Sequence, residues 1–159
     1  MFGLKKIDLV KFVIPPAYAA GFYFFNRFLL DTAFYLGGWY LGVFLLILDK
    51  QKLYQFYYKE IHEKNDRFAR LITRSFFFLL AYVILAIFLI TSSGSPLGIG
   101  LIMGIGLSLT FEMWQSRNFV EFFNEYFIQS KKAWTAGEIN NLVLAFVAFF
   151  IITSLMSIL

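Results

Sequence analysis

Long uncharged runs divide this chain into segments of the length that crosses a lipid bilayer. Residues 139–159 carry no charge and approach the ~20 residues that a helix needs to span ~30 Å of hydrocarbon. Residues 75–111 are also uncharged, but they contain the turn-forming sequence Thr91–Gly98. We therefore predict two helices there, over about 74–92 and 96–114, joined by a hairpin. Residues 32–48 form a further uncharged run, which predicts a fourth span.

The segment before residue 31 allows three interpretations. Pro15-Pro16 is expected to break a helix that begins at Ile7, so that a second helix would start at Pro16 and reach only Asn26. The segment is then a short spanning helix, a re-entrant segment, or an amphipathic stretch at the interface. We favour a spanning helix, because Phe28 and the two leucines after it can lengthen the crossing.

The distribution of basic residues predicts an orientation. Apart from Arg27, they fall before residue 12, between residues 49 and 74, and between residues 115 and 138, whereas the 93–96 hairpin has none. Lys and Arg are enriched on the cytoplasmic side of membrane proteins. With five spans, all three stretches lie on one side. This arrangement predicts a multi-pass protein of the cell membrane with a cytoplasmic N-terminus and an external C-terminus.

Apolar residues continue at helical spacing beyond two of the spans, which predicts two helices extended into the cytoplasm. The second extension carries an aromatic stripe that includes Phe119, Phe122 and Phe123. Such a stripe packs against the other extension, lies on lipid headgroups, or forms a docking surface for a cytoplasmic partner.

The order of span, cytoplasmic helix and span occurs twice, in 33–93 and again in 97–159, after an N-terminal unit of 1–32. The pair Gly38 and Gly42 recurs as Gly100 and Gly104, 62 positions further along the chain. The sequence thus predicts a tandem duplication. Because both copies would cross the membrane in the same direction, the repeats are parallel and related by an axis along the membrane normal.

The same glycines predict close helix packing, since small residues let membrane helices approach each other. The two glycine faces either pack on each other within one chain or drive assembly with another subunit, which includes a homo-oligomer.

Two acidic residues, Asp49 and Glu112, follow equivalent spans. An ionised carboxylate inside the hydrocarbon is costly, so such acids persist where they have a purpose. They are interfacial acids, or they form a paired site for a cation, a proton or a lipid amine. Lys50 and Arg117 are their nearest basic neighbours in the sequence.

Three arginines, Arg67, Arg70 and Arg74, recur at spacings of three and four and form one basic helix face. This face either anchors the chain on lipid phosphates or forms a specific site for an anionic lipid.

Composition limits the remaining chemistry. The chain is 60% hydrophobic and 15% charged, outside the range of soluble domains, and contains no cysteine and one histidine. We find no catalytic or nucleotide-binding motif, and we expect no cofactor, no metal and no nucleic-acid partner. The fold class predicted is an all-α transmembrane bundle of four to five spans.

The function that this pattern favours is a non-enzymatic membrane subunit or assembly factor, with the lipid bilayer and a membrane protein as partners. One alternative is a small homo-oligomeric channel or transporter whose inner mouth is lined by Asp49 and Glu112. Another is a lipid-modifying enzyme at the inner interface that uses these acids with His62 and the arginines.

Overall fold

The structure, a computed structural model, describes residues 4–26, 28–49, 72–130 and 132–158. It is 88% helical, and its described residues form no strand, which confirms the prediction of an all-α protein. The elements, in order, are α1 (Leu4–Asn26), α2 (Leu29–Leu48), η2 (Ile72–Arg74), α4 (Phe76–Phe88), η3 (Leu89–Ser93), α5 (Pro96–Ser116), α6 (Val120–Phe123), η4 (Asn124–Ile128) and α7 (Ala136–Met156).

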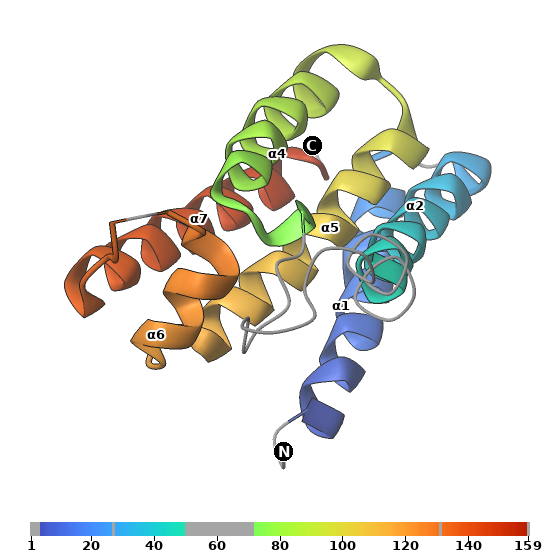
Figure 1. Cartoon of the computed structure of the whole chain (residues 1–159). Coiled ribbons are helices and arrows are strands. Elements are labelled where there is room, and N and C mark those ends of the chain that lie inside the picture. Colours follow the sequence, from blue (N-terminus) through green and yellow to red (C-terminus); the bar gives the residue numbers. More distant parts are fainter. Residues whose placement is uncertain (1–3, 27, 50–71, 131, 159) are drawn as a thin grey trace.

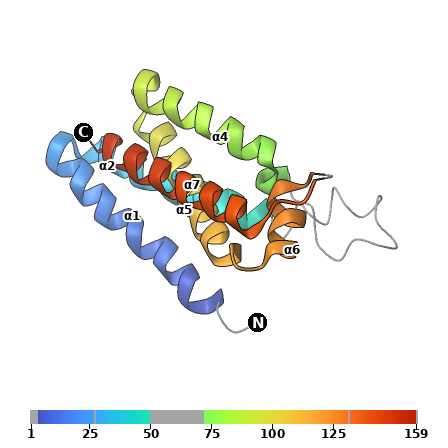
Figure 2. The ribbon, with the colours of Figure 1, turned by 90° about the vertical axis from the view of Figure 1, so that its left-hand side faces the viewer.

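Three of these helices, α2, α5 and α7, are long and apolar enough to cross a membrane. A shorter apolar helix covers Phe76–Ser92, where α4 runs into the π-helical turn η3. The long helices form a bundle with α5 near its centre, and the N- and C-termini lie at opposite ends (Figures 1 and 2). We call the end that holds α6 the α6 end.

Local capping explains where the later helices begin. The Ser95 side chain accepts a hydrogen bond from the backbone N–H of Gly98 at 3.3 Å, and Pro96 occupies the first helical turn of α5. Gly94 adopts a left-handed conformation in the predicted hairpin. Thr135 and Glu138 form a capping box at the start of α7.

The first helix corrects one prediction, because α1 continues through Pro15 and Pro16 instead of breaking there. A proline at position 16 leaves the carbonyl of Phe12 without its usual N–H donor. The Tyr40 hydroxyl of α2 donates a hydrogen bond to that carbonyl at 3.1 Å, and the rings of Phe12 and Tyr40 stack. A tertiary contact thus replaces the hydrogen bond that the proline removes.

The predicted extension of α5 is also wrong. The helix ends at Ser116, the N–H of Phe119 donates to the Ser116 carbonyl, and α6 and η4 form a separate short turn. The reason is burial, since Phe123 and Phe127 belong to the core and fold back against the bundle. The other predicted extension lies outside the described residues.

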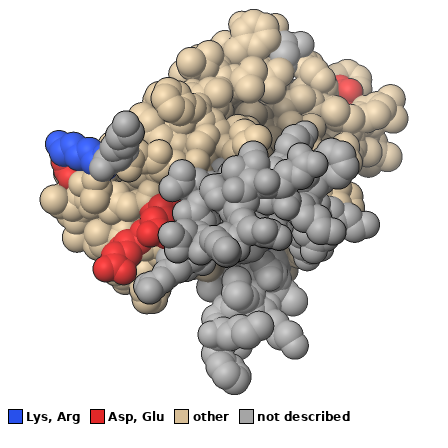
Figure 3. All heavy atoms as spheres, in the orientation of Figure 1, with Lys and Arg blue, Asp and Glu red and all other residues tan. Residues whose placement is uncertain are grey.

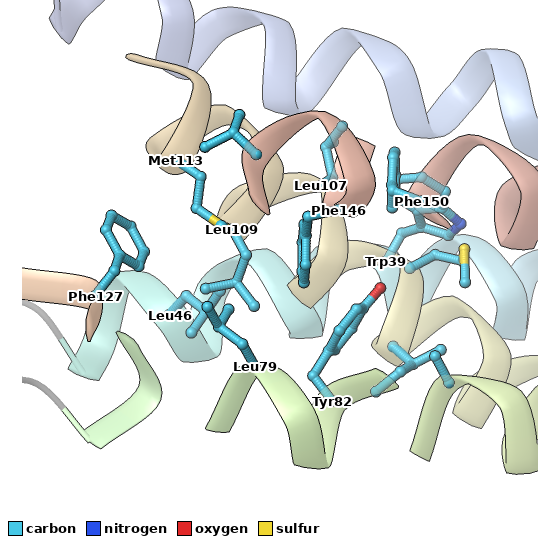
Figure 4. Close-up of a cluster of buried hydrophobic side chains, with 14 of the residues drawn as sticks. Trp39, Leu46, Leu79, Tyr82, Leu107, Leu109, Met113, Phe127, Phe146 and Phe150 are labelled. Carbon is cyan, nitrogen blue, oxygen red and sulfur yellow. The ribbon is translucent and has the colours of Figure 1, made fainter. Parts of the chain in front are cut away.

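The core gathers around α5, in which ten of 21 residues are buried. Figure 4 shows Trp39 and Leu46 of α2, Leu79 and Tyr82 of α4, and aromatic residues of α7 surrounding Leu107, Leu109 and Met113. The central helix is therefore apolar on nearly all sides, as expected for a helix enclosed by others.

The closest helix pair is α2 and α5, which cross through the four predicted glycines. A methyl group on Gly38 or Gly42 would overlap the carbonyl oxygen of Leu97 or Leu101, respectively. Such an approach brings the two backbones into direct van der Waals contact.

The contact is reciprocal. A methyl group on Gly100 would overlap the carbonyl oxygen of Tyr35, and one on Gly104 would overlap that of Trp39. Each of these four glycines therefore faces a backbone carbonyl of the other helix. In every case that carbonyl belongs to the residue three positions before one of the other helix's two crossing glycines. The two helices contact each other with nearly equivalent surfaces.

Gly38→Ala and Gly37→Ala form a matched pair that tests this crossing. A methyl group on Gly38 must displace the α5 backbone, so we expect a loss of about 1–3 kcal/mol in the free energy of unfolding. Gly37 has open space beside it, so Gly37→Ala should leave stability unchanged or slightly higher. Unfolding in mixed micelles measures both, and equal losses would contradict the crossing.

Candidate functional site

Charged side chains from four elements meet at the α6 end of the bundle. Arg74, at the end of η2, lies between Asp49, which caps the C-terminus of α2, and Glu112 in the last turns of α5. Its Nε and Nη2 atoms donate to the two carboxylate oxygens of Glu112 at 2.9 and 3.0 Å. Its Nη1 atom donates to Asp49 Oδ2 at 3.3 Å.

The remaining contacts complete this set, which we call the ion cluster. Arg74 Nη1 also donates to the Thr73 hydroxyl at 2.6 Å, and Nη2 donates to the Leu46 carbonyl at 3.3 Å. Thr73 in turn donates to Asp49 Oδ2. Lys11 of α1 is buried and lies 3.8 Å from Glu112 Oε1.

Burial sets the electrostatics of the cluster. Only 1% of the Arg74 surface is exposed, and burial alone lowers its pKa. The charge and hydrogen bonds of Glu112, together with Asp49, outweigh that effect and raise the pKa of Arg74, so the guanidinium stays charged. Burial and the nearby Glu112 charge raise the pKa of the Tyr126 phenol, which stays neutral.

Among the described residues, two cations of the cluster, Arg74 and Lys11, face two carboxylates, those of Asp49 and Glu112. Taking ions out of water costs several kcal/mol each, and good geometry with further hydrogen bonds is needed to offset that cost. The two-oxygen contact with Glu112 supplies such geometry. The arrangement fixes α1, α2, α5 and the start of α4 to one another at this end.

The structure corrects the sequence interpretation of these residues. Arg74 was predicted to face lipid phosphates, but its N–H groups are directed at protein acceptors inside the bundle. Asp49 and Glu112 are brought together as a pair, and Arg74 lies between them where the sequence pointed to Arg117 as a partner of Glu112. Lys50, Arg67, Arg70 and His62 lie outside the described residues.

The aromatic stripe separates into buried and exposed members. Phe123 is fully buried and Phe122 is half-buried and packs against the core, so neither offers an open docking surface. Phe119 is 67% exposed and is the member that a partner can reach. The stripe failed as a prediction of one continuous face because the chain turns between Ser116 and Val120.

Asn124 is a polar residue that sequence reasoning missed. Its side chain accepts from the Trp134 N–H at 2.7 Å and donates to the Trp134 carbonyl at 2.9 Å, which ties η4 to the start of α7.

Asn124 also lines an open groove of about 410 Å³ with Glu121 and Glu125. Figure 3 shows acidic atoms beside α6, surrounded by uncharged atoms of the described residues. In the described part of the chain, no three His, Cys, Asp or Glu residues are placed to hold a metal ion.

Hydroxyl groups join the helices at the opposite end, and these contacts were also missed. Tyr35 and Ser157 are 2.9 Å apart through their side-chain oxygens, and Tyr18 and Ser154 are 3.1 Å apart. Both serines donate to carbonyls of α7, so the tyrosines act as donors. Serines three residues apart in the last turns of an apolar helix are the sequence signal for such contacts.

The described fold defines an all-helical bundle with three helices able to cross a membrane and a buried ion cluster at one end. A comparison of the chain with known protein families, curated proteins and solved structures gives no match. Its function has therefore to be inferred from its own residues.

Arg74→Gln should destabilise the bundle by about 3–5 kcal/mol, because it removes the cation that contacts both the buried Asp49 and the partly buried Glu112. Glu112→Gln alone should also be costly, and the double variant should lose less than the two single losses together. Lys132→Gln, at an exposed lysine, is the control for charge loss. Additive losses in an unfolding titration would show that Arg74 and Glu112 are not coupled.

Proposed function

We propose that this chain is a small multi-pass protein of the cell membrane that acts as a non-enzymatic subunit or assembly factor. The observation that carries the proposal is the set of contacts made by its two candidate site acids. Asp49 and Glu112 are both turned toward Arg74 within the bundle and serve to hold helices together.

The arrangement of the helices supports four to five spans. Besides the three long apolar helices, α4 with η3 is an apolar helix, and α1 has 23 residues, which corresponds to about 35 Å of helix. Lys11, Arg74 and Arg117 lie at the α6 end, and each belongs to one of the three basic stretches of the sequence. This end is the cytoplasmic one in our proposal, so the N-terminus is cytoplasmic and the C-terminus external.

The glycine crossing supports the tandem repeat. Gly38 and Gly42 face α5 carbonyls in the same way that Gly100 and Gly104 face α2 carbonyls. Two copies of one ancestral unit, related by an axis along the membrane normal, would produce such a reciprocal contact. The ion cluster follows the same relation, because each copy supplies one carboxylate to Arg74.

The outer surface supports assembly within the membrane. Large apolar side chains cover the outward faces of α4 and α7, and Phe77 alone is 81% exposed. In a bilayer these faces contact lipid or another membrane protein.

A channel with an acidic mouth is the second candidate, but it requires the two acids to line an open path. An interfacial lipid-modifying enzyme requires the same acids to be available for chemistry.

Single cysteines test the topology without interference, because the chain contains none. Ser92→Cys, beside the 93–96 hairpin, should react with a membrane-impermeant maleimide added to intact cells. Ala133→Cys, between η4 and α7, should react only after the membrane is opened. The reverse pattern would invert the orientation, and labelling of both positions from outside would exclude the proposed number of spans.

Native mass spectrometry of the gently extracted protein tests the function. We expect a second polypeptide in fixed stoichiometry, and Phe119→Ser should release it while leaving helix content unchanged, because Phe119 is exposed. Val120→Ser, at a partly buried neighbour, is the control for a general effect on α6. A homo-oligomer without any partner would overturn the proposal and favour a channel.

A further inference from the structure

Arg117, the residue that caps the C-terminus of α5, has its guanidinium over an aromatic ring. Its guanidinium carbon is 3.4 Å from the centre of the Trp114 ring, one helical turn earlier. This contact is a cation–π interaction, and it fixes the direction of a side chain that is otherwise flexible. Trp114 is 42% exposed, so the pair lies on the outside of the bundle.

The N–H groups of Arg117 remain available in this geometry. Stacking uses the face of the guanidinium, whereas its N–H donors point outward in the plane and match two oxygens of a phosphate. The ion pairs of the described residues involve Lys11 and Arg74, and none of them includes Arg117. The ion cluster therefore uses Arg74, and Arg117 offers a fixed cation at the surface.

The position along α5 places the pair at the depth of lipid headgroups, provided that α5 spans the bilayer. Gly106 is the middle residue of the helix. At about 1.5 Å per residue, Trp114 is about 12 Å and Arg117 about 16 Å from the midplane, beside a hydrocarbon boundary at about 15 Å. Tryptophan is enriched at this boundary, and phosphates lie just outside it.

We propose that Trp114 and Arg117 form a binding site for the headgroup of an anionic phospholipid at the α6 end. The phosphate accepts hydrogen bonds from Arg117, and Trp114 packs along the upper part of the acyl chains. The partner is lipid because the exposed indole adjoins the cation at membrane depth, and the negative headgroup complements it. This site rests on the proposed spanning of α5 and replaces Arg74 as a lipid contact.

Lipid retention in native mass spectrometry tests the site. The protein is purified with an equal mixture of phosphatidylglycerol and phosphatidylcholine, and the bound lipids are counted. We expect the wild type to retain phosphatidylglycerol preferentially. Arg117→Gln should lower that preference by about tenfold, because it removes the charge-assisted hydrogen bonds that the guanidinium makes to the phosphate. Trp114→Leu keeps the apolar volume but removes the stacked ring, and it should also lower the preference.

Lys132→Gln is the matched control, since it removes one exposed positive charge at the same end of the bundle and should retain the wild-type preference. Equal losses in Arg117→Gln and Lys132→Gln would reveal a general charge effect and overturn the site. A wild-type preference in Arg117→Gln or in Trp114→Leu would also overturn it. Cysteine labelling reports separately on the spans, so correct labelling with lost lipid preference would reject the site alone.

Discussion

The direct backbone contact between α2 and α5 is the constraint on which the rest of the bundle depends. Within hydrocarbon, apolar burial no longer drives helices together, so close packing has to supply the attraction. Glycine at Gly38, Gly42, Gly100 and Gly104 removes the side chains that would hold the helices apart. The crossing then fixes how far the helix ends separate toward the α6 end, and so determines the space that other side chains fill.

That space is filled by Arg74. Asp49 follows Gly42 by seven residues and Glu112 follows Gly104 by eight, which is about 11 and 12 Å of helix, so the two acids arrive at nearly the same level. A single guanidinium reaches both carboxylates and the Leu46 carbonyl. Buried ion pairs contribute more to a defined arrangement than to stability. Here the cluster sets the register of the helices, while aromatic and aliphatic packing around α5 supplies most of the cohesion.

The two ends of the bundle are held by different chemistry. Charged groups join the helices at the α6 end, and neutral hydroxyl pairs such as Tyr35 and Ser157 join them at the other. The α6 end also presents Arg117 and Trp114 on its outer surface. Two arginines at the α6 end thus have different environments: Arg74 contacts Asp49 and Glu112 inside the bundle, and Arg117 lies over the exposed ring of Trp114.

The sequence by itself determined the local features of this protein. Uncharged runs located the apolar helices, and the turn-forming residues 91–98 located the hairpin between two of them, because turn preferences depend on neighbours along the chain. Charge counts could not identify the partner of Asp49, since Arg74 is 25 positions away and reaches it only when α2 and α4 are brought together.

Tertiary contacts also determine that α1 continues through Pro15 and Pro16. From the sequence, a helix is expected to break at Pro16 because the Phe12 carbonyl loses its N–H donor. In the structure, the hydroxyl of Tyr40 in α2 donates to that carbonyl instead. The turn after Ser116 has the same kind of cause, since burial of Phe123 outweighs the tendency of the helix to continue. Periodicity records which residues are apolar, whereas the partner that covers them depends on contacts between distant segments.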